Sequence, residues 1–171
     1  MSRFELTDII RMLPCESSEG DPLSLADVGC ASAAQTFPYV GKYKHVHLLD
    51  LPNINQDFVK WRSKERAYNH VSTGSLHDIE EPVNIMICFD VLEHIPNSSG
   101  FFHVMDSRLQ RDGLLLLRTP WYSMVPHIEH LPEAEQNWHE QGGEARLKKH
   151  YELVHPLEYG GIYKKSKVRP R

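Results

Sequence analysis

Short apolar segments alternate with segments of helical periodicity along most of this chain, and that alternation limits the fold more than any other sequence feature. The apolar runs predict strands at residues 23–28, 45–50, 67–71, 84–89 and 114–118. The helical patterns lie at residues 6–13, 31–39, 54–62, 98–110 and 133–149. Strands that alternate with helices form mainly parallel sheets with helices on both faces. The sequence therefore predicts a doubly wound α/β fold.

Two further runs, at residues 151–154 and 161–168, flank the Gly160-Gly161 pair near the end of the chain. Glycine pairs suit tight hairpin turns, so these runs predict a closing antiparallel hairpin. The result is a seven-stranded mixed sheet in which only the last strand is antiparallel. Since no linker divides the chain, we expect residues 1–171 to form a single domain.

The formal net charge of −4 hides an uneven distribution of charge. Residues 146–171 carry a net charge of +6, so the residues before them carry −10. An acidic body repels a phosphate backbone, and this disfavours nucleic acid as a partner. The basic tail either guides an anionic substrate toward a site or is a solvated surface segment.

Cysteine usage and the N-terminal residues bear on location. The spacing of Cys15, Cys30 and Cys88 argues against a disulfide framework and suits a reducing compartment. The N-terminal residues lack the pattern of a secretory signal, and no segment has the apolar length of a membrane span. We therefore expect a cytoplasmic protein with no membrane span. The oligomeric state is left open by the sequence.

Ligands of doubly wound folds bind at the carboxyl ends of the parallel strands, so the residues after each strand are the candidates for a site. The first strand runs into Gly29, where a turn without a side chain lets a ligand approach the backbone. The second strand ends at Asp50, 21 residues after Gly29. A carboxylate at about that spacing accepts hydrogen bonds from both hydroxyls of a ribose. Each residue also has a plain structural interpretation, as a turn glycine and a helix cap.

Longer motifs follow the fourth and fifth strands: residues 88–96 read CFDVLEHIP, and residues 113–120 read GLLLLRTP. Together with Asp27-Val28-Gly29 and Asp50, these motifs resemble those of the class I S-adenosylmethionine-dependent methyltransferases in order and spacing. The similarity is greatest to the branch of ubiquinone-biosynthesis O-methyltransferases and small-RNA 2′-O-methyltransferases. It covers residues 24–120.

This resemblance implies a Rossmann-like methyltransferase fold that transfers a methyl group to an oxygen or nitrogen of a small-molecule acceptor. The expected parts are an N-terminal helix and loop (1–22), a cofactor-binding core (23–120), an acceptor-side insert (121–150), and the closing hairpin with its basic tail (151–171). The resemblance also implies the residues that contact S-adenosylmethionine: Asp27, Gly29, Cys30, Ala31, Asp50, Leu51, Ser75, Leu76, Phe89 and Asp90.

The sequence departs from the family pattern at several positions. Ala31 and Ala33 stand where the family has the second and third motif glycines. Ser75 stands where the family usually has an Asp that contacts the adenine edge, and Asn84 replaces an Asp in the fourth strand. We expect the departure at Ser75 to weaken recognition of the adenine.

A sulfonium methyl is already activated, so the main task of the protein is to bring the nucleophile in line. His94 and Glu93 are the candidate base and positioning residue, unless they only begin a helix. Trp121, Tyr122 and His130 are candidate acceptor contacts, although Trp121 suits a core position equally well.

Some members of the same branch bind a divalent metal through a Glu-x-x-Glu-His run and a later His. The matching residues here, with an Asp in place of the first Glu, are Asp90, Glu93, His94 and His130. Carboxylate and imidazole ligands suit Mg²⁺, Mn²⁺ or Zn²⁺. Many metal-free relatives carry the same run, so the metal stays an open alternative.

Three other functions remain alternatives. A methyltransferase-like domain that has lost two motif glycines would serve as a binding or partner subunit, and it would not bind the cofactor. A nucleic-acid methyltransferase is disfavoured by the acidic body. An NAD-binding enzyme shares the glycine turn, but it has no need of the motifs at residues 88–96 and 113–120.

Overall fold

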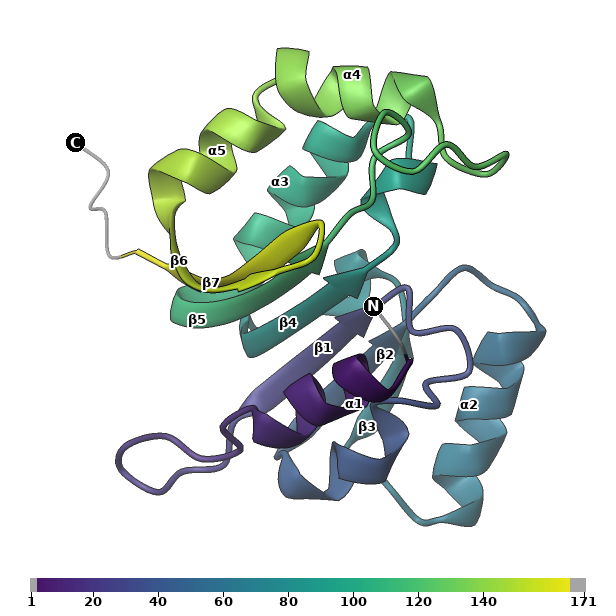
Figure 1. Ribbon diagram of the computed structural model, residues 1–171. Helices are drawn as coiled ribbons and strands as arrows, with labels where there is room; N and C mark the ends of the chain where they lie inside the picture. Colours follow the sequence, from purple (N-terminus) through teal and green to yellow (C-terminus); the bar gives the residue numbers. More distant parts are fainter. Residues whose placement is uncertain (1–2, 167–171) are drawn as a thin grey trace.

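Seven strands of the computed structural model, which describes residues 3–166, form one mixed sheet (Figure 1). Their bounds are β1 (Ser24–Val28), β2 (His45–Leu49), β3 (Val71–Gly74), β4 (Val83–Phe89), β5 (Leu109–Arg118), β6 (Tyr151–Leu157) and β7 (Gly160–Lys165). They lie in the order β3-β2-β1-β4-β5-β7-β6. The first five strands pair in parallel, and β7 runs antiparallel to β5 and β6. The predicted doubly wound sheet with an antiparallel last strand is confirmed. We also expect the strands at residues 23–28 and 84–89 to be adjacent and parallel, and β1 and β4 pair in this way.

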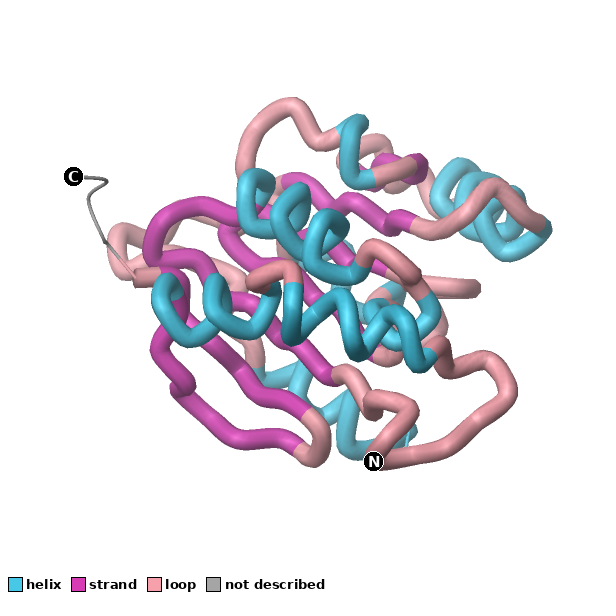
Figure 2. Tube along the Cα trace, turned by 90° about the horizontal axis from the view of Figure 1, so that it is seen from above, coloured by secondary structure: helices cyan, strands magenta, loops and turns pink. Residues whose placement is uncertain are grey.

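Helices cover both faces of the sheet. They are α1 (Arg3–Met12), α2 (Ile54–Glu65), α3 (Ser98–Arg108), α4 (Pro132–Glu140), α5 (Gly143–His150) and the short 3-10 helices η1 (Phe37–Lys42), η2 (Leu76–Asp78) and η3 (Leu92–His94). In Figure 1, α1 and α2 lie on one side of the sheet and α3, α4 and α5 on the other. Figure 2 shows helices lying across the strands when the chain is seen from above. Of the helices within residues 3–166, none has the length and apolar character needed to cross a membrane.

The central strands are buried on both faces, because helices cover both sides of the sheet. Successive side chains of a strand point to opposite sides, so they enter different clusters. Leu25 and Ile85 pack into the hydrophobic cluster on the side of α1 and α2. Their neighbours Ala26 and Met86 pack into the cluster on the side of α3, α4 and α5. The two clusters fix β1 and β4 between them, and thus fix where the carboxyl ends of these strands lie.

The prediction of a helix at residues 31–39 is wrong. Ala31 and Ala33 have left-handed backbone, with φ of 48° and 52°, which no α-helix accommodates. The segment forms turns and then η1, whose first turn contains Pro38. The small residues of this segment favour a helix by propensity, and the sequence pattern therefore predicted one. Tertiary contacts of the segment override that propensity.

The hairpin turn was also predicted at the wrong residues. The turn lies at Glu158 and Tyr159, and Tyr159 has a φ of 61°. Gly160 already pairs with β5, and a β-carbon on it would lie 2.0 Å from the carbonyl oxygen of Leu117. The glycine is therefore required by the close approach of β5, not by the turn. The predicted strand at residues 161–168 and the basic tail extend beyond residue 166, outside the described residues.

Three other predicted bounds differ from the structure. The third strand was expected at residues 67–71, but Ala67 has a φ of 53° and the strand begins at Val71. The single helix expected at residues 133–149 is divided into α4 and α5 at Gly142, whose φ is 86°. The fifth strand is longer than predicted, since it begins at Leu109.

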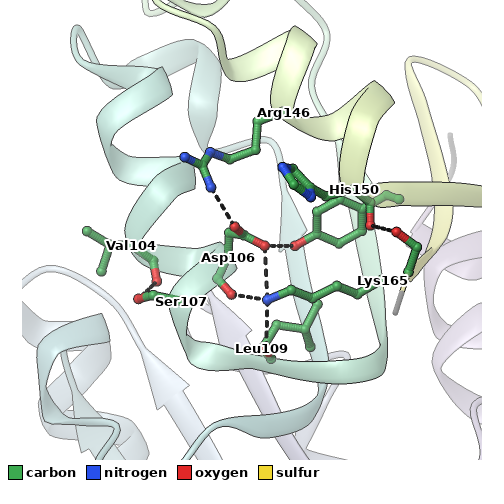
Figure 3. A network of polar contacts seen from close by, with 9 residues as sticks. Val104, Asp106, Ser107, Leu109, Arg146, His150 and Lys165 are labelled. Atoms are coloured by element: carbon green, nitrogen blue, oxygen red, sulfur yellow. Dashed lines mark hydrogen bonds and ion pairs between the residues drawn. The ribbon is translucent and has the colours of Figure 1, made fainter. Parts of the chain in front are cut away.

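A carboxylate near the end of α3 joins the C-terminal elements to the rest of the fold (Figure 3). Asp106 accepts hydrogen bonds from Arg146 of α5 (2.9 Å) and the Tyr151 hydroxyl of β6 (2.7 Å), and it pairs with Lys165 of β7 (3.0 Å). Burial works to raise the pKa of Asp106, but the hydrogen bonds from Tyr151 and Lys165 outweigh it and leave that pKa below its usual value.

We predict that Asp106→Asn lowers the free energy of unfolding by about 2–3 kcal/mol, because it removes charged hydrogen bonds. A pKa that is lower in the folded state gives stability above the unfolded pKa and loses it as the pH falls through the folded pKa. The difference between wild type and variant should therefore shrink on acidification below about pH 4. Urea unfolding of the wild type and the variant at several pH values measures this difference in stability. Ser107→Ala, on the same helix, is the control and should change stability by less than about 0.5 kcal/mol. An equal loss in both variants contradicts the assignment.

Candidate functional site

A cavity of about 360 Å³ lies where β1, β2 and β3 end, and η3 and α3 close its other side. Its lining combines backbone, carboxylate, imidazole and apolar groups: Val28, Gly29, Leu49, Asp50, Leu51, Gly74, Ser75, Leu76, Asp90, Val91, His94, Ile95 and Phe101. Its volume lies in the range of pockets that bind small molecules and cofactors. The cavity lies at the edge of the sheet to which the strand-end argument assigned the candidate site.

Gly29 lines this cavity at a position that leaves no room for a side chain. Its φ is +73°, and its backbone N–H donates to the carbonyl of Leu49 (2.8 Å). A β-carbon on Gly29 would lie 2.3 Å from Cγ2 of Val91, which follows β4. The turn after β1 and the segment after β4 therefore touch through a backbone that carries no side chain.

Asp50 stands at the edge of the cavity with both carboxylate oxygens engaged by backbone donors. The N–H of Ala31 donates to one oxygen (2.6 Å), and the N–H of Leu51 donates to the other (2.7 Å). Each carboxylate oxygen has a second lone-pair direction, so Asp50 retains capacity to accept hydroxyl hydrogen bonds. Leu51 also lines the cavity, with 76% of its surface exposed, and offers an apolar face to a ligand.

Four of the predicted cofactor residues do not line the cavity. Asp27 is buried and accepts a hydrogen bond from the Thr36 hydroxyl, and its burial raises its pKa to about 7. Cys30 is buried in the cluster on the side of α1 and α2, against which Phe89 also packs. Ala31 is exposed and reaches the site only through its N–H to Asp50. The predicted residues that do line the cavity are Gly29, Asp50, Leu51, Ser75, Leu76 and Asp90.

Two of the four departures from the family pattern, at Ser75 and Asn84, have local structural partners. The backbone N–H and the hydroxyl of Ser75 both donate to Asp78 (2.7 and 2.9 Å), so a carboxylate stands three residues after the expected position. These hydrogen bonds keep the pKa of Asp78 below its usual value. Asn84 lies at the far end of β4, where its side chain accepts from the N–H and hydroxyl of Ser24 (both 2.9 Å). Asn84 therefore joins the beginnings of β1 and β4.

Asp90 forms an ion pair that the sequence did not reveal. It follows β4 with a φ of 55°, and its carboxylate lies 2.5 Å from Nη1 of Arg118 at the end of β5. Burial raises the pKa of Asp90, and the Arg118 guanidinium offsets part of that rise. The motif at residues 113–120 contained Arg118, but only the pairing of β4 with β5 brings it to the site.

Three side chains that could bind a metal come together beside the cavity: Glu93, His94 and His130. Each offers one ligand atom, and these three atoms all lie within 4.8 Å of one another. Glu93 is fully buried, and neither carboxylate oxygen has a hydrogen-bond partner among residues 3–166. Nε2 of His94 lies 3.9 Å from this carboxylate, and the two imidazole rings are 5.2 Å apart. Burial raises the pKa of Glu93 to about 8, so the carboxyl holds its proton at neutral pH unless a positive charge lies beside it.

Both histidines have one ring nitrogen fixed by a backbone carbonyl. Nδ1 of His94 lies 2.7 Å from the carbonyl oxygen of Glu129, and Nδ1 of His130 lies 2.8 Å from that of Val125. A carbonyl only accepts, so each Nδ1 carries the proton and each Nε2 keeps its lone pair. Asp90, the fourth predicted metal ligand, lies outside this cluster.

The predicted acceptor residues are separated. Trp121 is buried and packs on Trp138 of α4, with 5.7 Å between the ring centroids. It lines a second cavity of about 490 Å³ between β5, β7 and the α4–α5 pair. Tyr122 is partly exposed and lines neither cavity, whereas His130 belongs to the cluster with Glu93.

A doubly wound sheet with a cavity beyond the carboxyl ends of β1 and β2 defines a Rossmann-like ligand-binding protein. The methyltransferase domain family matches residues 5–163, and the chain belongs to this family. No curated protein matches the chain by sequence.

Solved methyltransferase structures share the fold. NodS, an N-methyltransferase from Bradyrhizobium japonicum in complex with S-adenosylhomocysteine, superposes with a TM-score of 0.65 at 15% identity, over 95% of this chain and 86% of NodS. CalS10, an amino pentose methyltransferase from Micromonospora echinaspora with bound S-adenosylmethionine, superposes with a TM-score of 0.53 at 19% identity, over 70% of this chain and 50% of CalS10. Coclaurine N-methyltransferase superposes with a TM-score of 0.53 at 20% identity, over 66% of this chain and 34% of that protein. This chain covers half or less of the length of the latter two proteins.

We predict that Gly29→Ala lowers the free energy of unfolding by about 2–4 kcal/mol, since left-handed strain adds to an overlap with Val91. Gly20→Ala isolates the strain, because Gly20 has a φ of +86° and open space around it. Gly41→Ala has neither problem and should be close to neutral. Thermal and urea unfolding of the three variants measure the effects. Val91→Ala should restore part of the loss in Gly29→Ala, and failure to do so contradicts the contact.

Proposed function

We propose that this chain transfers a methyl group from S-adenosylmethionine to an oxygen or nitrogen nucleophile of a small-molecule acceptor. The cavity that joins Gly29 to Asp50 carries the proposal, because it presents bare backbone and a carboxylate at one edge of the sheet. Membership of the methyltransferase domain family supports it. The run at residues 92–95 and the nearby His130 support the finer resemblance to the ubiquinone-biosynthesis and small-RNA branch.

We assign the cavity residues to the parts of such a cofactor in order. Asp50 would accept the ribose hydroxyls, and Leu51 and Leu76 would contact the adenine. Gly29 would lie beside the methionine part, because its backbone carries no side chain into the cavity. Ser75 and Asp90 would supply polar contacts at the two ends. The bound S-adenosylhomocysteine in NodS supports this arrangement by analogy of fold.

When bound, S-adenosylmethionine supplies an electrophilic methyl group on a sulfonium, and S-adenosylhomocysteine remains after transfer. His94 lines the cavity with a free Nε2, so it would take the proton that a hydroxyl or ammonium nucleophile releases. The carbonyl of Glu129 would stabilise the resulting imidazolium, since it accepts from Nδ1. Glu93, buried behind His94, would orient the imidazole or balance its charge.

A divalent metal at Glu93, His94 and His130 is the alternative to the general-base role, because both roles use Nε2 of His94. The buried carboxylate, which has no hydrogen-bond partner in the described part of the chain, and the two Nε2 atoms form a donor set that suits Zn²⁺ or Mn²⁺ better than Mg²⁺. Histidine ligands commonly donate their other N–H to a carbonyl, as both do here. The metal would polarise an acceptor oxygen and help it lose its proton.

We predict that Asp50→Ala weakens binding of S-adenosylhomocysteine by about 1.5–3 kcal/mol, the range for hydrogen bonds to a charged group. Isothermal titration calorimetry measures the affinity. Asp21→Ala removes an exposed carboxylate that does not line the cavity, and it should leave affinity unchanged. An unchanged affinity in Asp50→Ala excludes the ribose role. If the wild type shows no binding and no thermal shift, the chain is a degenerate binding or partner subunit.

For the catalytic end, His94→Ala should abolish turnover while S-adenosylhomocysteine still binds. If the metal is present, Zn²⁺ or Mn²⁺ should raise the melting temperature of the wild type but not of Glu93→Gln, and a chelator should abolish turnover. A chelator without effect, with His94→Ala inactive, refutes the metal and leaves the general base. If both treatments leave turnover unchanged, neither role survives.

A further inference from the structure

The outer face of α2 is more apolar than the face it buries. Ile54 is 82% exposed, Trp61 is 56% exposed and Phe58 is 42% exposed. These residues are four and three positions apart, so they lie along one side of the helix. The residues that α2 buries against the sheet are Gln56, Val59 and Ser63.

This arrangement is the reverse of an ordinary surface helix, which turns its apolar stripe toward the core. The buried amide of Gln56 donates to the carbonyl of Leu48 (3.1 Å), and the buried hydroxyl of Ser63 has no partner among the described residues. Polar residues thus take the inner positions while an aromatic pair faces outward. An exposed apolar stripe of this kind is typical of a surface that contacts another protein, a membrane or a ligand.

The stripe also has a defined shape. The rings of Phe58 and Trp61 lie 5.7 Å apart and border a hollow of about 400 Å³, which Arg62, Glu65 and Arg66 complete. The hollow lies one turn beyond Trp61 toward the C-terminal end of the helix. Ile54 lies at the opposite end of the stripe. A protruding apolar residue at one end and a hollow at the other are complementary when two such helices run antiparallel.

We propose that this stripe binds the same stripe of a second copy of the chain, with the two α2 helices antiparallel about a twofold axis between Phe58 and Trp61. Phe58 then packs against Trp61 of the partner subunit, and Ile54 enters the hollow beside Glu65 of the partner subunit. A twofold contact uses the same surface on both copies, so it closes into a dimer.

The charges beside the stripe favour a second copy as the occupant. Asp57 and Lys64 are seven residues apart, about two helical turns, so they lie on the same flank of the stripe. Antiparallel packing brings Asp57 close to Lys64 of the partner subunit, and the twofold axis repeats that pair. Parallel packing would place this flank of the two copies on opposite sides of the contact, so Asp57 and Lys64 of the two copies would not meet.

Sedimentation velocity at increasing protein concentration tests this dimer. The wild type should show a reversible monomer–dimer equilibrium, and Trp61→Ser should raise the dissociation constant at least about tenfold, as expected for a central aromatic contact. Val154→Ser removes an exposed apolar residue of β6 and should leave the equilibrium unchanged. Because these side chains are exposed, circular dichroism should show that every variant is folded.

Charge reversal tests the antiparallel geometry. Asp57→Lys and Lys64→Asp should each weaken the dimer, because each places like charges in contact at two positions. The double variant, or an equal mixture of the two single variants, should restore dimerisation. A wild type that stays monomeric, a Trp61→Ser variant that dimerises as well as wild type, or a mixture that does not associate overturns the proposal. None of these results depends on methyl transfer, so the dimer and the enzymatic activity fail separately.

Discussion

The cavity depends on the close packing of the turn after β1 against the segment after β4. Gly29 adopts positive φ there and lies so close to Val91 that a β-carbon would overlap it. The carboxylate of Asp50 holds the same turn from the side of β2 by accepting the N–H of Ala31. These contacts join the ends of three strands, so they set the spacing between Asp50 and His94. We propose that Asp50 binds the ribose of the cofactor and that His94 takes the proton of the nucleophile.

The parallel strands and the location of the cavity were predictable because they rest on local patterns. The apolar runs that form β1 and β4 have no alternative to burial on both faces, and parallel strands bring their carboxyl ends to one edge. The helix expected at residues 31–39 failed for a nonlocal reason. Ala31 takes left-handed backbone where its N–H meets Asp50, and nothing in the neighbouring residues indicates that contact.

The candidate site was predictable in position but not in every residue. Motif spacing identified Asp50 and His94, which both line the cavity, while Phe89 packs on the opposite side of the sheet. Residues near a strand end alternate between faces, so consecutive motif residues cannot all reach one ligand. Glu93 illustrates the other limit. Its carboxylate is buried with no hydrogen-bond partner within residues 3–166, and this burial, from which the metal proposal comes, depends on how α4 packs over η3.

The central claim is that the cavity beside Gly29 and Asp50 holds S-adenosylmethionine. Amide resonances in a ¹H–¹⁵N spectrum, recorded during titration with S-adenosylhomocysteine, test it most directly. The account predicts saturable shifts at Gly29, Leu51 and Ser75, with the indole resonance of Trp138 at the second cavity unchanged. Shifts confined to Trp138, or no saturable shift at any of these residues, would contradict it.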